Sequence, residues 1–361
     1  MKIISTSYSR SKEYNDPEEW LSRISFYTGI LEQLAKDHEV TSIERINYEG
    51  VSRRNGVNYY FMDLKQDVVR FPFRMHRVIR QFQPDVVLVN GLIFPLQVMQ
   101  LKRKLGKRVK IIVLHRAERP SKNLKAYFQR AADRYVDHYL FASSEIGDEW
   151  RRAGVIGDLD KIREIMQSSS VFIPTELHHA GDPEAPVFLW VGRLDANKDP
   201  ITVLRAFTRF LTEKPSAKLV MIYQKDDLLD EVKDLIQSHD HASRSISLIG
   251  KVLHHDMQRW YNGADFIISG SHYEGSGISV LEAMSCGCIP ILTNIASFRR
   301  MTGPGICGLL FEPGNADSLV DALRKTKQMD REKERSKTIQ RFQREFSFVA
   351  IAGKINALIH E

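Results

Sequence analysis

The chain contains 361 residues, which is enough for two domains of ordinary size. Its hydrophobic content of 43% and charged content of 27% indicate a soluble globular protein. The longest apolar stretch, residues 86–96, is interrupted by Asn90, Gly91 and Pro95 and is too short to span a bilayer.

The cysteines and the beginning of the chain favour a reducing compartment. Cys286, Cys288 and Cys307 provide neither an even disulfide framework nor a C-x2-C pair for zinc. The apolar residues that follow Met1 are too few to form the core of a signal peptide. We therefore expect a cytoplasmic protein.

Basic residues are concentrated in the first half of the chain. Residues 1–172 contain 29 Lys and Arg against 21 Asp and Glu, whereas the remainder has a net charge of −1. Most of the excess lies in residues 70–134, which hold 16 basic and 3 acidic residues. Such a patch could meet nucleic acid, anionic lipid or an acidic acceptor, or it could be a solvated face of helices.

One segment of this range has the pattern of an amphipathic helix. Arginines recur every three or four residues, so most of them can share one face, and apolar residues are interleaved with them. This character favours reversible attachment to the inner face of the membrane, with a solvated face as the alternative. The segment contains Arg70, Arg74, Arg77 and Arg80 together with Phe71, Phe73, Val78 and Phe82.

Apolar runs in the first half predict buried strands that alternate with helices. The runs lack polar alternation, which is typical of strands buried on both faces of a parallel sheet. Residues 18–37 have the apolar spacing of one helix, which Asp16 and Pro17 would begin. The predicted strands are residues 2–4, 86–89, 109–114 and 139–142.

A polar stretch at residues 168–181 interrupts the alternation. It contains Pro174, His178, His179 and Gly181 and predicts a hinge between two domains. The alternation then resumes in the second half. We predict strands at 187–191, 218–222, 245–249, 266–269, 289–292 and 308–311, and helices at 200–212, 228–238, 255–262, 278–285, 317–327 and 331–361 with a break near 346–348.

A glycine-rich loop joins the strand at 266–269 to the helix at 278–285. The loop contains Glu274-Gly275-Ser276-Gly277, and Gly287 ends the helix. A loop of this kind presents backbone N–H groups at the start of a helix, where they and the helix dipole bind anions, most often phosphate. The sequence therefore predicts an anion site at this loop.

Two glutamates frame the predicted anion site. Glu274 lies before the helix and Glu282 lies about one turn inside it. A carboxylate is a poor ligand for phosphate but a good acceptor of hydrogen bonds from sugar or ribose hydroxyls. Elsewhere two glutamates at this spacing would be solvated, but the glycines and the flanking strands favour a binding site here.

The stretch EGSGISVLE, with Glu274-x7-Glu282, resembles the signature of retaining, nucleotide-sugar-dependent glycosyltransferases of the GT-B fold, family 4 type (glycosyl transferases group 1). The resemblance covers most of residues 85–330. It implies an α/β protein with two Rossmann-like domains, the active site in the interdomain cleft, and a last helix that crosses back to the first domain. We therefore expect domains at residues 1–172 and 173–345 and a C-terminal helix at 346–361.

A second motif, WVGRLDANK, ends a predicted strand and carries Arg193 and Lys198 at its carboxyl edge, where α/β proteins gather ligands. By the resemblance, both residues would stabilise the negative charge of the diphosphate leaving group without a metal. Their alternative interpretation is a surface basic pair. The family's usual glycine after the lysine is Asp199 here, and we expect this departure to affect helix capping more than phosphate binding.

The resemblance also implies which residues hold the donor. Glu282 would accept hydrogen bonds from the ribose, and Glu274 would bind the transferred sugar and steady an oxocarbenium-like transition state. The backbone of the glycine loop would hold the diphosphate or the sugar, and the end of the strand near residue 250 would hold the base, although by sequence alone it is only a strand end. The loop residues are Gly275, Ser276, Gly277, Ile278 and Ser279, and the base-binding residues are Gly250, Lys251 and Val252.

His115 follows the predicted strand at 109–114 and resembles the family's first-domain histidine near the reacting sugar. We expect it to face the cleft and to act in catalysis, with a structural histidine as the alternative. Arg116, Glu118 and Arg119 continue the same loop and could meet the acceptor.

The resemblance implies an enzyme that transfers a hexose from a nucleotide diphosphate sugar to a glycan, lipid-linked or small-molecule acceptor, with retention of configuration. No metal or other cofactor is expected, because Arg193, Lys198 and the helix N-terminus supply the positive field. The adjacent pairs His178–His179 and His254–His255 are poor chelators, so we interpret them as surface residues.

Two other functions fit parts of this pattern. A sugar-nucleotide epimerase of the same architecture would also cleave a bond between nucleotide and sugar, but the basic pair combined with both glutamates favours transfer. A non-catalytic, glycosyltransferase-like binding protein would not need both Glu274 and Glu282. No nucleic-acid partner is expected.

Overall fold

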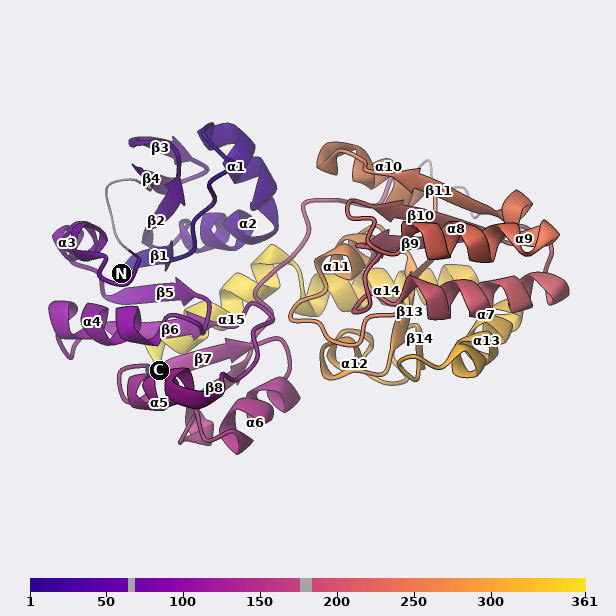
Figure 1. The fold of residues 1–361 in the computed structure, drawn as a ribbon. Helices are drawn as coiled ribbons and strands as arrows, with labels where there is room; N and C mark the ends of the chain where they lie inside the picture. The colour runs from indigo at the N-terminus through magenta and orange to yellow at the C-terminus, as the bar shows by residue number, and fades with distance from the viewer. Residues whose placement is uncertain (64–68, 176–183) are drawn as a thin grey trace. The chain divides into compact units, whose positions relative to one another are not determined.

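The computed structural model describes residues 1–63, 69–175 and 184–361, and it divides into two compact units (Figure 1). Unit 1 comprises residues 1–169 and 347–361, and unit 2 comprises residues 170–346. Each unit has a mostly parallel sheet covered by helices, which confirms the predicted α/β class with two Rossmann-like domains. Part of the expected hinge, including His178 and His179, lies outside the described residues.

Unit 1 is built on a sheet whose strand order in the described chain is β3-β4-β2-β1-β5-β6-β7-β8 (Figure 1). β3 runs antiparallel to β4, and the other neighbouring pairs are parallel. The central strands are almost entirely buried, which explains their unbroken apolar sequence. The strands are β1 (Lys2–Ser7), β2 (Glu39–Ile46), β3 (Gly50–Arg54), β4 (Val57–Asp63), β5 (Val86–Asn90), β6 (Lys110–Leu114), β7 (His138–Phe141) and β8 (Ile162–Glu164).

The helices of unit 1 differ from the prediction in one place. The single helix expected over residues 18–37 is wrong, because two helices meet at Ile24, whose φ of −101° and ψ of 17° leave the helical region. Asp16 begins the first of them as predicted, accepting a hydrogen bond from Glu19 N at 2.8 Å. The helices are α1 (Pro17–Arg23), α2 (Ser25–Leu34), α3 (Phe73–Gln81), α4 (Pro95–Leu105), α5 (Asn123–Asp133), α6 (Ser144–Arg152) and α15 (Phe348–His360).

Helix α15, at the end of the chain, packs against α2 within unit 1 (Figure 1). The contact depends on Gly29 of α2, because a Cβ atom there would lie 2.6 Å from the ring of Phe348. His38 and Asn356 join the same two parts of the chain through a hydrogen bond of 2.7 Å. The last helix is therefore part of the core of unit 1.

Unit 2 has the strand order β11-β10-β9-β12-β13-β14 in its described residues, and all neighbouring pairs are parallel. Phe188 and Phe266 stack at 4.8 Å between the central strands. The six strands predicted for this half are confirmed, with ends shifted by one residue at most. They are β9 (Val187–Gly192), β10 (Lys218–Tyr223), β11 (Ile246–Gly250), β12 (Phe266–Ser269), β13 (Ile289–Thr293) and β14 (Leu309–Phe311).

The helices of unit 2 connect these parallel strands, so the carboxyl ends of the strands and the beginnings of the helices gather at one edge of the sheet. The predicted helix at 278–285 matches α11, and the predicted break near 346–348 separates α14 from α15. Two short helices, α9 and α12, were not predicted. The helices are α7 (Pro200–Glu213), α8 (Leu229–Gln237), α9 (Asp240–Ser245), α10 (Met257–Asn262), α11 (Ile278–Ser285), α12 (Ala296–Thr302), α13 (Ala316–Lys325) and α14 (Arg331–Glu345).

Candidate active site

An ion pair between Lys198 and Glu274 lies beyond the carboxyl ends of β9 and β12. Asp195 closes the turn that precedes Lys198 by accepting a hydrogen bond from the Lys198 backbone N–H at 2.9 Å. Glu274 Oε1 also accepts a hydrogen bond from Ser271 Oγ at 2.8 Å. The side chains of Lys198 and Glu274 are 18% and 13% exposed, so the pair is largely withdrawn from water.

Arg193 takes a different position from Lys198. Its Nε lies 3.0 Å from Asp195 Oδ2, and its side chain is 49% exposed. The structure therefore brings Lys198 and Glu274 together. It places Arg193, paired with Asp195, at the more exposed rim of the candidate site.

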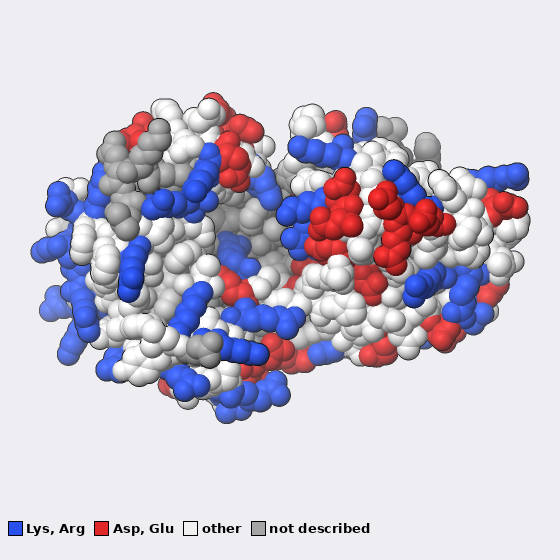
Figure 2. Space-filling view, in the orientation of Figure 1, with Lys and Arg blue, Asp and Glu red and all other residues white. Residues whose placement is uncertain are grey.

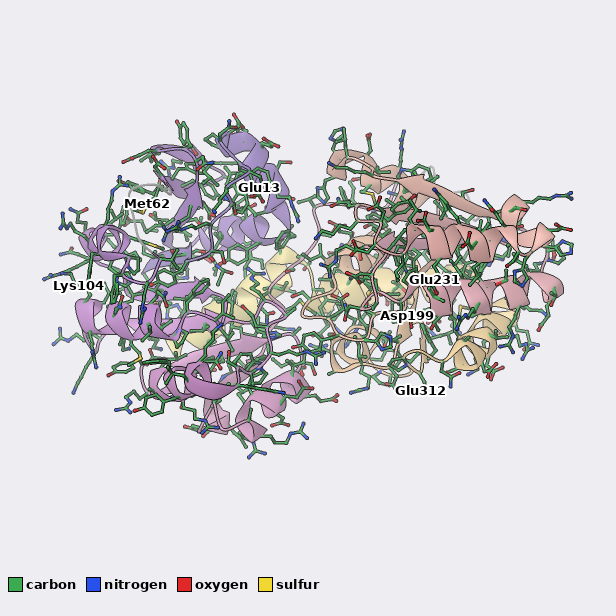
Figure 3. The ribbon with its side chains drawn as sticks, viewed as in Figure 1. Glu13, Met62, Lys104, Asp199, Glu231 and Glu312 are labelled. Atoms are coloured by element: carbon green, nitrogen blue, oxygen red, sulfur yellow. The ribbon has the colours of Figure 1, made fainter. Side chains whose placement is uncertain are left out.

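Asp199, which is labelled in Figure 3, directly follows Lys198 and stabilises the loop there. Its φ of +44° lies in the left-handed region, which is costly for a residue with a Cβ atom. Its carboxylate accepts a hydrogen bond from Thr202 N at 3.1 Å, which caps α7, and lies 3.1 Å from His272 Nε2. The expectation that Asp199 acts in helix capping is confirmed.

The glycine loop enters α11 through Gly277. This residue has a φ of +54°, and a Cβ atom there would lie 2.9 Å from Phe298 Cε1. Both the backbone and the available space therefore require glycine. The loop that follows Glu274 thus leads directly to the first turn of α11, where backbone N–H groups have no acceptor within the helix.

Glu282 lies on α11 and is 6% exposed. Its Oε1 is 2.7 Å from His254 Nε2, and its Oε2 accepts a hydrogen bond from Tyr261 OH at 2.8 Å. Burial, reinforced by the carboxylate of Glu282, raises the pKa of Tyr261 well above its usual value, so the phenol stays protonated and donates. Two side chains from other elements therefore fix the carboxylate.

His254 was predicted to be a surface residue, which its exposure confirms, but its contact with Glu282 was not predicted. Its side chain is 41% exposed, but it contacts Glu282, and its ring lies 5.0 Å from the ring of Phe172. It follows the segment Gly250-Lys251-Val252 at the carboxyl end of β11. That position in a parallel sheet was the one signal in the sequence that could have identified it.

His115 lies inside unit 1. Its ring is 0% exposed and lies 5.1 Å from the ring of Phe141 and 6.1 Å from that of Trp150. Its Nε2 is 2.8 Å from the backbone carbonyl oxygen of Glu118, and burial lowers its pKa, so the imidazole is neutral. The apolar rings of Phe141 and Trp150 pack beside His115, and its role near the reacting sugar stays a prediction.

Comparisons with known proteins give the family. The family described as "Glycosyl transferases group 1" matches residues 176–344, and "Glycosyltransferase Family 4" matches residues 28–165. The chain belongs to the group 1 glycosyltransferase family of the GT-B fold. Together the two matches cover most of both units, so the resemblance noted in the sequence is confirmed.

Two relatives match this chain at low sequence identity. The chain is 24% identical over 340 residues to a GDP-mannose:cellobiosyl-diphosphopolyprenol alpha-mannosyltransferase of Xanthomonas campestris, covering 90% of this chain and 82% of that one. It is 28% identical over 144 residues to a D-inositol 3-phosphate glycosyltransferase of Streptosporangium roseum. That second match spans only 36% of this chain and 31% of the relative.

Solved structures share the fold. Anabaena HepE in complex with UDP aligns with a TM-score of 0.74 at 14% identity, covering all of both chains. The lipopolysaccharide outer core galactosyltransferase WaaB aligns with a TM-score of 0.69 at 17% identity, covering 100% of this chain and 99% of that one. Within residues 1–63, 69–175 and 184–361, no helix has the length and apolar character needed to cross a membrane.

Proposed function

We propose that this protein transfers a hexose from a nucleotide diphosphate sugar to an acceptor hydroxyl, with retention of configuration. The observation that carries the proposal is the Lys198–Glu274 pair, which places a cation and a carboxylate side by side before the start of α11. The cation and the helix N-terminus bind the negative charge of a diphosphate, and the carboxylate accepts hydrogen bonds from the hydroxyls of a sugar.

In the proposed reaction, the bond between the anomeric carbon and the diphosphate oxygen breaks, and the electron pair stays on the diphosphate. Lys198, Arg193 and the backbone of residues 275–279 stabilise that charge as it develops. The acceptor oxygen bonds to the anomeric carbon from the face that the diphosphate leaves, and the acceptor proton passes to the departing diphosphate. Glu274 stabilises the positive charge on the sugar, and the positive field of these groups replaces a metal ion.

The other predicted residues hold the nucleotide. Glu282, fixed by His254 and Tyr261, accepts hydrogen bonds from the ribose hydroxyls through its remaining lone pairs. Gly250, Lys251 and Val252 contact the base through the backbone. We assign His115 a positioning role, because its buried ring contacts the backbone carbonyl oxygen of Glu118.

The acceptor is proposed from the relatives and from the charge of unit 1. The Xanthomonas relative is named for a diphosphopolyprenol acceptor, and another relative, from Campylobacter jejuni, for a diphospho-undecaprenol acceptor. Lys and Arg side chains gather on the visible face of unit 1 (Figure 2). We therefore propose a lipid-linked or glycan acceptor and peripheral attachment to an anionic membrane surface on the cytoplasmic side.

Exposed apolar residues refine the membrane proposal. Val78 of α3 is buried, so it is not available to the membrane-facing apolar surface that the sequence predicted for this helix. Instead, Phe71, just before the helix, and Phe73, its first residue, are 48% and 68% exposed, and their rings stack at 5.9 Å. Arg70 lies over the ring of Phe71 at 5.8 Å. Exposed aromatic rings beside arginine suit the interface of an anionic bilayer.

The experiment is a calorimetric and thermal-shift screen of the whole protein against UDP-, GDP- and ADP-sugars. A bound donor at 100 times its Kd should stabilise the protein by about 2.7 kcal/mol. Lys198→Met should abolish most of that effect, whereas Lys214→Met, which breaks the ion pair with Glu184 at the far end of α7, should preserve it. Absence of binding by any donor, or equal binding by the Lys198 variant, would contradict the proposal.

A further inference from the structure

Unit 2 contains a cavity of about 790 Å³ at the amino ends of its central strands, a volume within the range of small-molecule sites. Pro186, Asp265 and Ile289, at the beginnings of β9, β12 and β13, are among its lining residues. Others come from the end of α7, the link between α13 and α14, and the first turns of α14. Lys198 and Glu274 lie beyond the carboxyl ends of β9 and β12, so the cavity belongs to the opposite edge of the same sheet.

Three of the basic side chains that line the cavity are already paired with acids. The ion pairs are Lys214–Glu184, Lys327–Glu213 and Arg331–Asp265. The carboxylate of Asp265 also accepts a hydrogen bond from the backbone N–H of Val187 at 2.8 Å, and the residue is 8% exposed. These groups therefore satisfy one another without a ligand.

Arg335 of α14 also lines the cavity, and it differs from the other three basic residues. Its Nη1 is buried and has no hydrogen-bond partner, and no carboxylate in the described part of the chain lies within ion-pair distance of it. Burial lowers its pKa, because withdrawal from water disfavours the charged form. Buried polar groups are nearly always bonded and buried charges are normally paired, so this guanidinium calls for a missing partner.

Gly287 gives Arg335 its position at the cavity. It lies in the turn between α11 and β13 with a φ of +90°, and a Cβ atom there would lie 2.7 Å from Arg335 Cζ. Both the backbone and the space that the guanidinium occupies therefore require glycine. Packing against this turn, and not a counter-charge, holds the positive charge of Arg335 at the cavity.

We propose that this cavity binds a small organic carboxylate, at a site separate from the donor site. Arg335 pairs with the carboxylate through parallel N–H···O bonds, which the planar guanidinium favours. Asp330 and Glu332, which also line the cavity, disfavour a ligand with a second negative charge. Apolar lining residues such as Met329 contact the body of the ligand. The inference does not depend on the proposed transferase function.

The test is a nuclear magnetic resonance titration of the whole protein, without nucleotide, using benzoate, benzamide and phenyl phosphate as probes. The three share one ring and differ in charge, so we expect benzoate to bind most tightly and neutral benzamide roughly 10-fold or more weakly. Arg335→Gln should weaken benzoate binding roughly 10-fold or more. Arg335→Lys should weaken it less, because an ammonium group keeps the charge but not the parallel bonds. Tighter binding of phenyl phosphate than of benzoate would contradict the assignment of a carboxylate.

Three further variants separate this site from folding and from the donor site. Arg344→Gln removes the same charge from an exposed position farther along α14 and should leave benzoate affinity unchanged, as should Lys198→Met. Glu332→Gln removes a repelling charge and should tighten benzoate binding at low salt, a gain that loss of folding cannot produce. The inference is overturned if benzoate binds no better than benzamide, or if Arg335→Gln binds benzoate as tightly as Arg344→Gln does.

Discussion

His254 Nε2 lies 2.7 Å from Glu282 Oε1, although the two residues are 28 positions apart in the chain. Tyr261 holds the other oxygen at 2.8 Å. A carboxylate fixed on both sides loses little conformational freedom when a ribose binds, so its hydrogen bonds contribute more to affinity.

This relationship predicts how the nucleotide site responds to substitution. Glu282→Gln should weaken nucleotide binding by about 1.5–3 kcal/mol, because it removes a charged acceptor and keeps the shape. His254→Ala should cost about 1 kcal/mol, because it frees only one side of the carboxylate, and His254→Gln should restore part of the loss. His255→Ala, at the exposed neighbouring position, is the matched control. Calorimetric measurement of nucleotide affinity on the four variants tests this prediction. If Glu282→Gln binds nucleotide as tightly as the parent protein, Glu282 is not part of the nucleotide site.

A second prediction concerns metal ions. If Lys198, Arg193 and the start of α11 supply the positive charge at the diphosphate, transfer should continue at full rate in excess EDTA. The measurement is release of free nucleoside diphosphate with and without chelator, followed by addition of magnesium or manganese. Loss of activity in EDTA that either ion restores would show that the protein's own cations are insufficient.

A third prediction concerns the membrane. The whole protein should sediment with anionic vesicles at low salt, with each basic residue near the surface contributing about 1 kcal/mol, and should dissociate near physiological salt, where the Debye length is about 8 Å. Phe71→Ser with Phe73→Ser should weaken sedimentation, whereas Val349→Ser, which alters an equally exposed apolar residue on α15, should not. Equal and negligible binding to neutral and anionic vesicles would leave a transferase that acts without a membrane.

A fourth prediction follows from His76, which is 3% exposed and whose Nε2 lies 2.9 Å from Tyr8 OH. Burial, with a smaller contribution from Lys104, lowers its pKa from 6.5 to about 4. Between pH 6.5 and 4 the unfolded chain binds a proton there that the folded chain does not, so the free energy of unfolding must fall as pH falls through this window.

The contribution of His76 is at most about 1.4 kcal/mol per pH unit within that window. Thermal unfolding of the parent and of His76→Gln, measured from pH 7 to pH 4, should show a smaller pH dependence in the variant. The same slope in both proteins would mean that His76 does not resist protonation in the folded state.

The sequence predicted the fold where burial is uniform. Strands such as β5, β6 and β12 are buried on both faces, so their unbroken apolar runs were sufficient. β2 was missed because Thr41, Ser42, Glu44 and Arg45 interrupt its apolar pattern, and yet all four are buried. Glu44 and Arg45 also line a cavity in unit 1, so this strand departs from the apolar pattern where its side chains meet that cavity.

The candidate site was predictable only in part. The spacing of Glu274, Gly277 and Glu282 was visible because one loop and one helix carry all three residues. The position of His115 was not visible, since its burial depends on Phe141 and Trp150, which come from a later strand and helix. The contact of His254 with Glu282 likewise depends on how β11 and α11 are placed across the sheet, which no local pattern encodes.

The packing of Phe348 against Gly29 affects the order in which the protein can fold during synthesis. Unit 2 is one continuous segment and can complete its core as soon as residue 346 has left the ribosome. Residues 1–169 emerge earlier, but they must wait for residues 347–361 to cover the surface of α2. The part of unit 1 that is made first should therefore be the last to reach its final stability, and a nascent chain would expose the Gly29 side of α2 to chaperones until residues 347–361 have emerged.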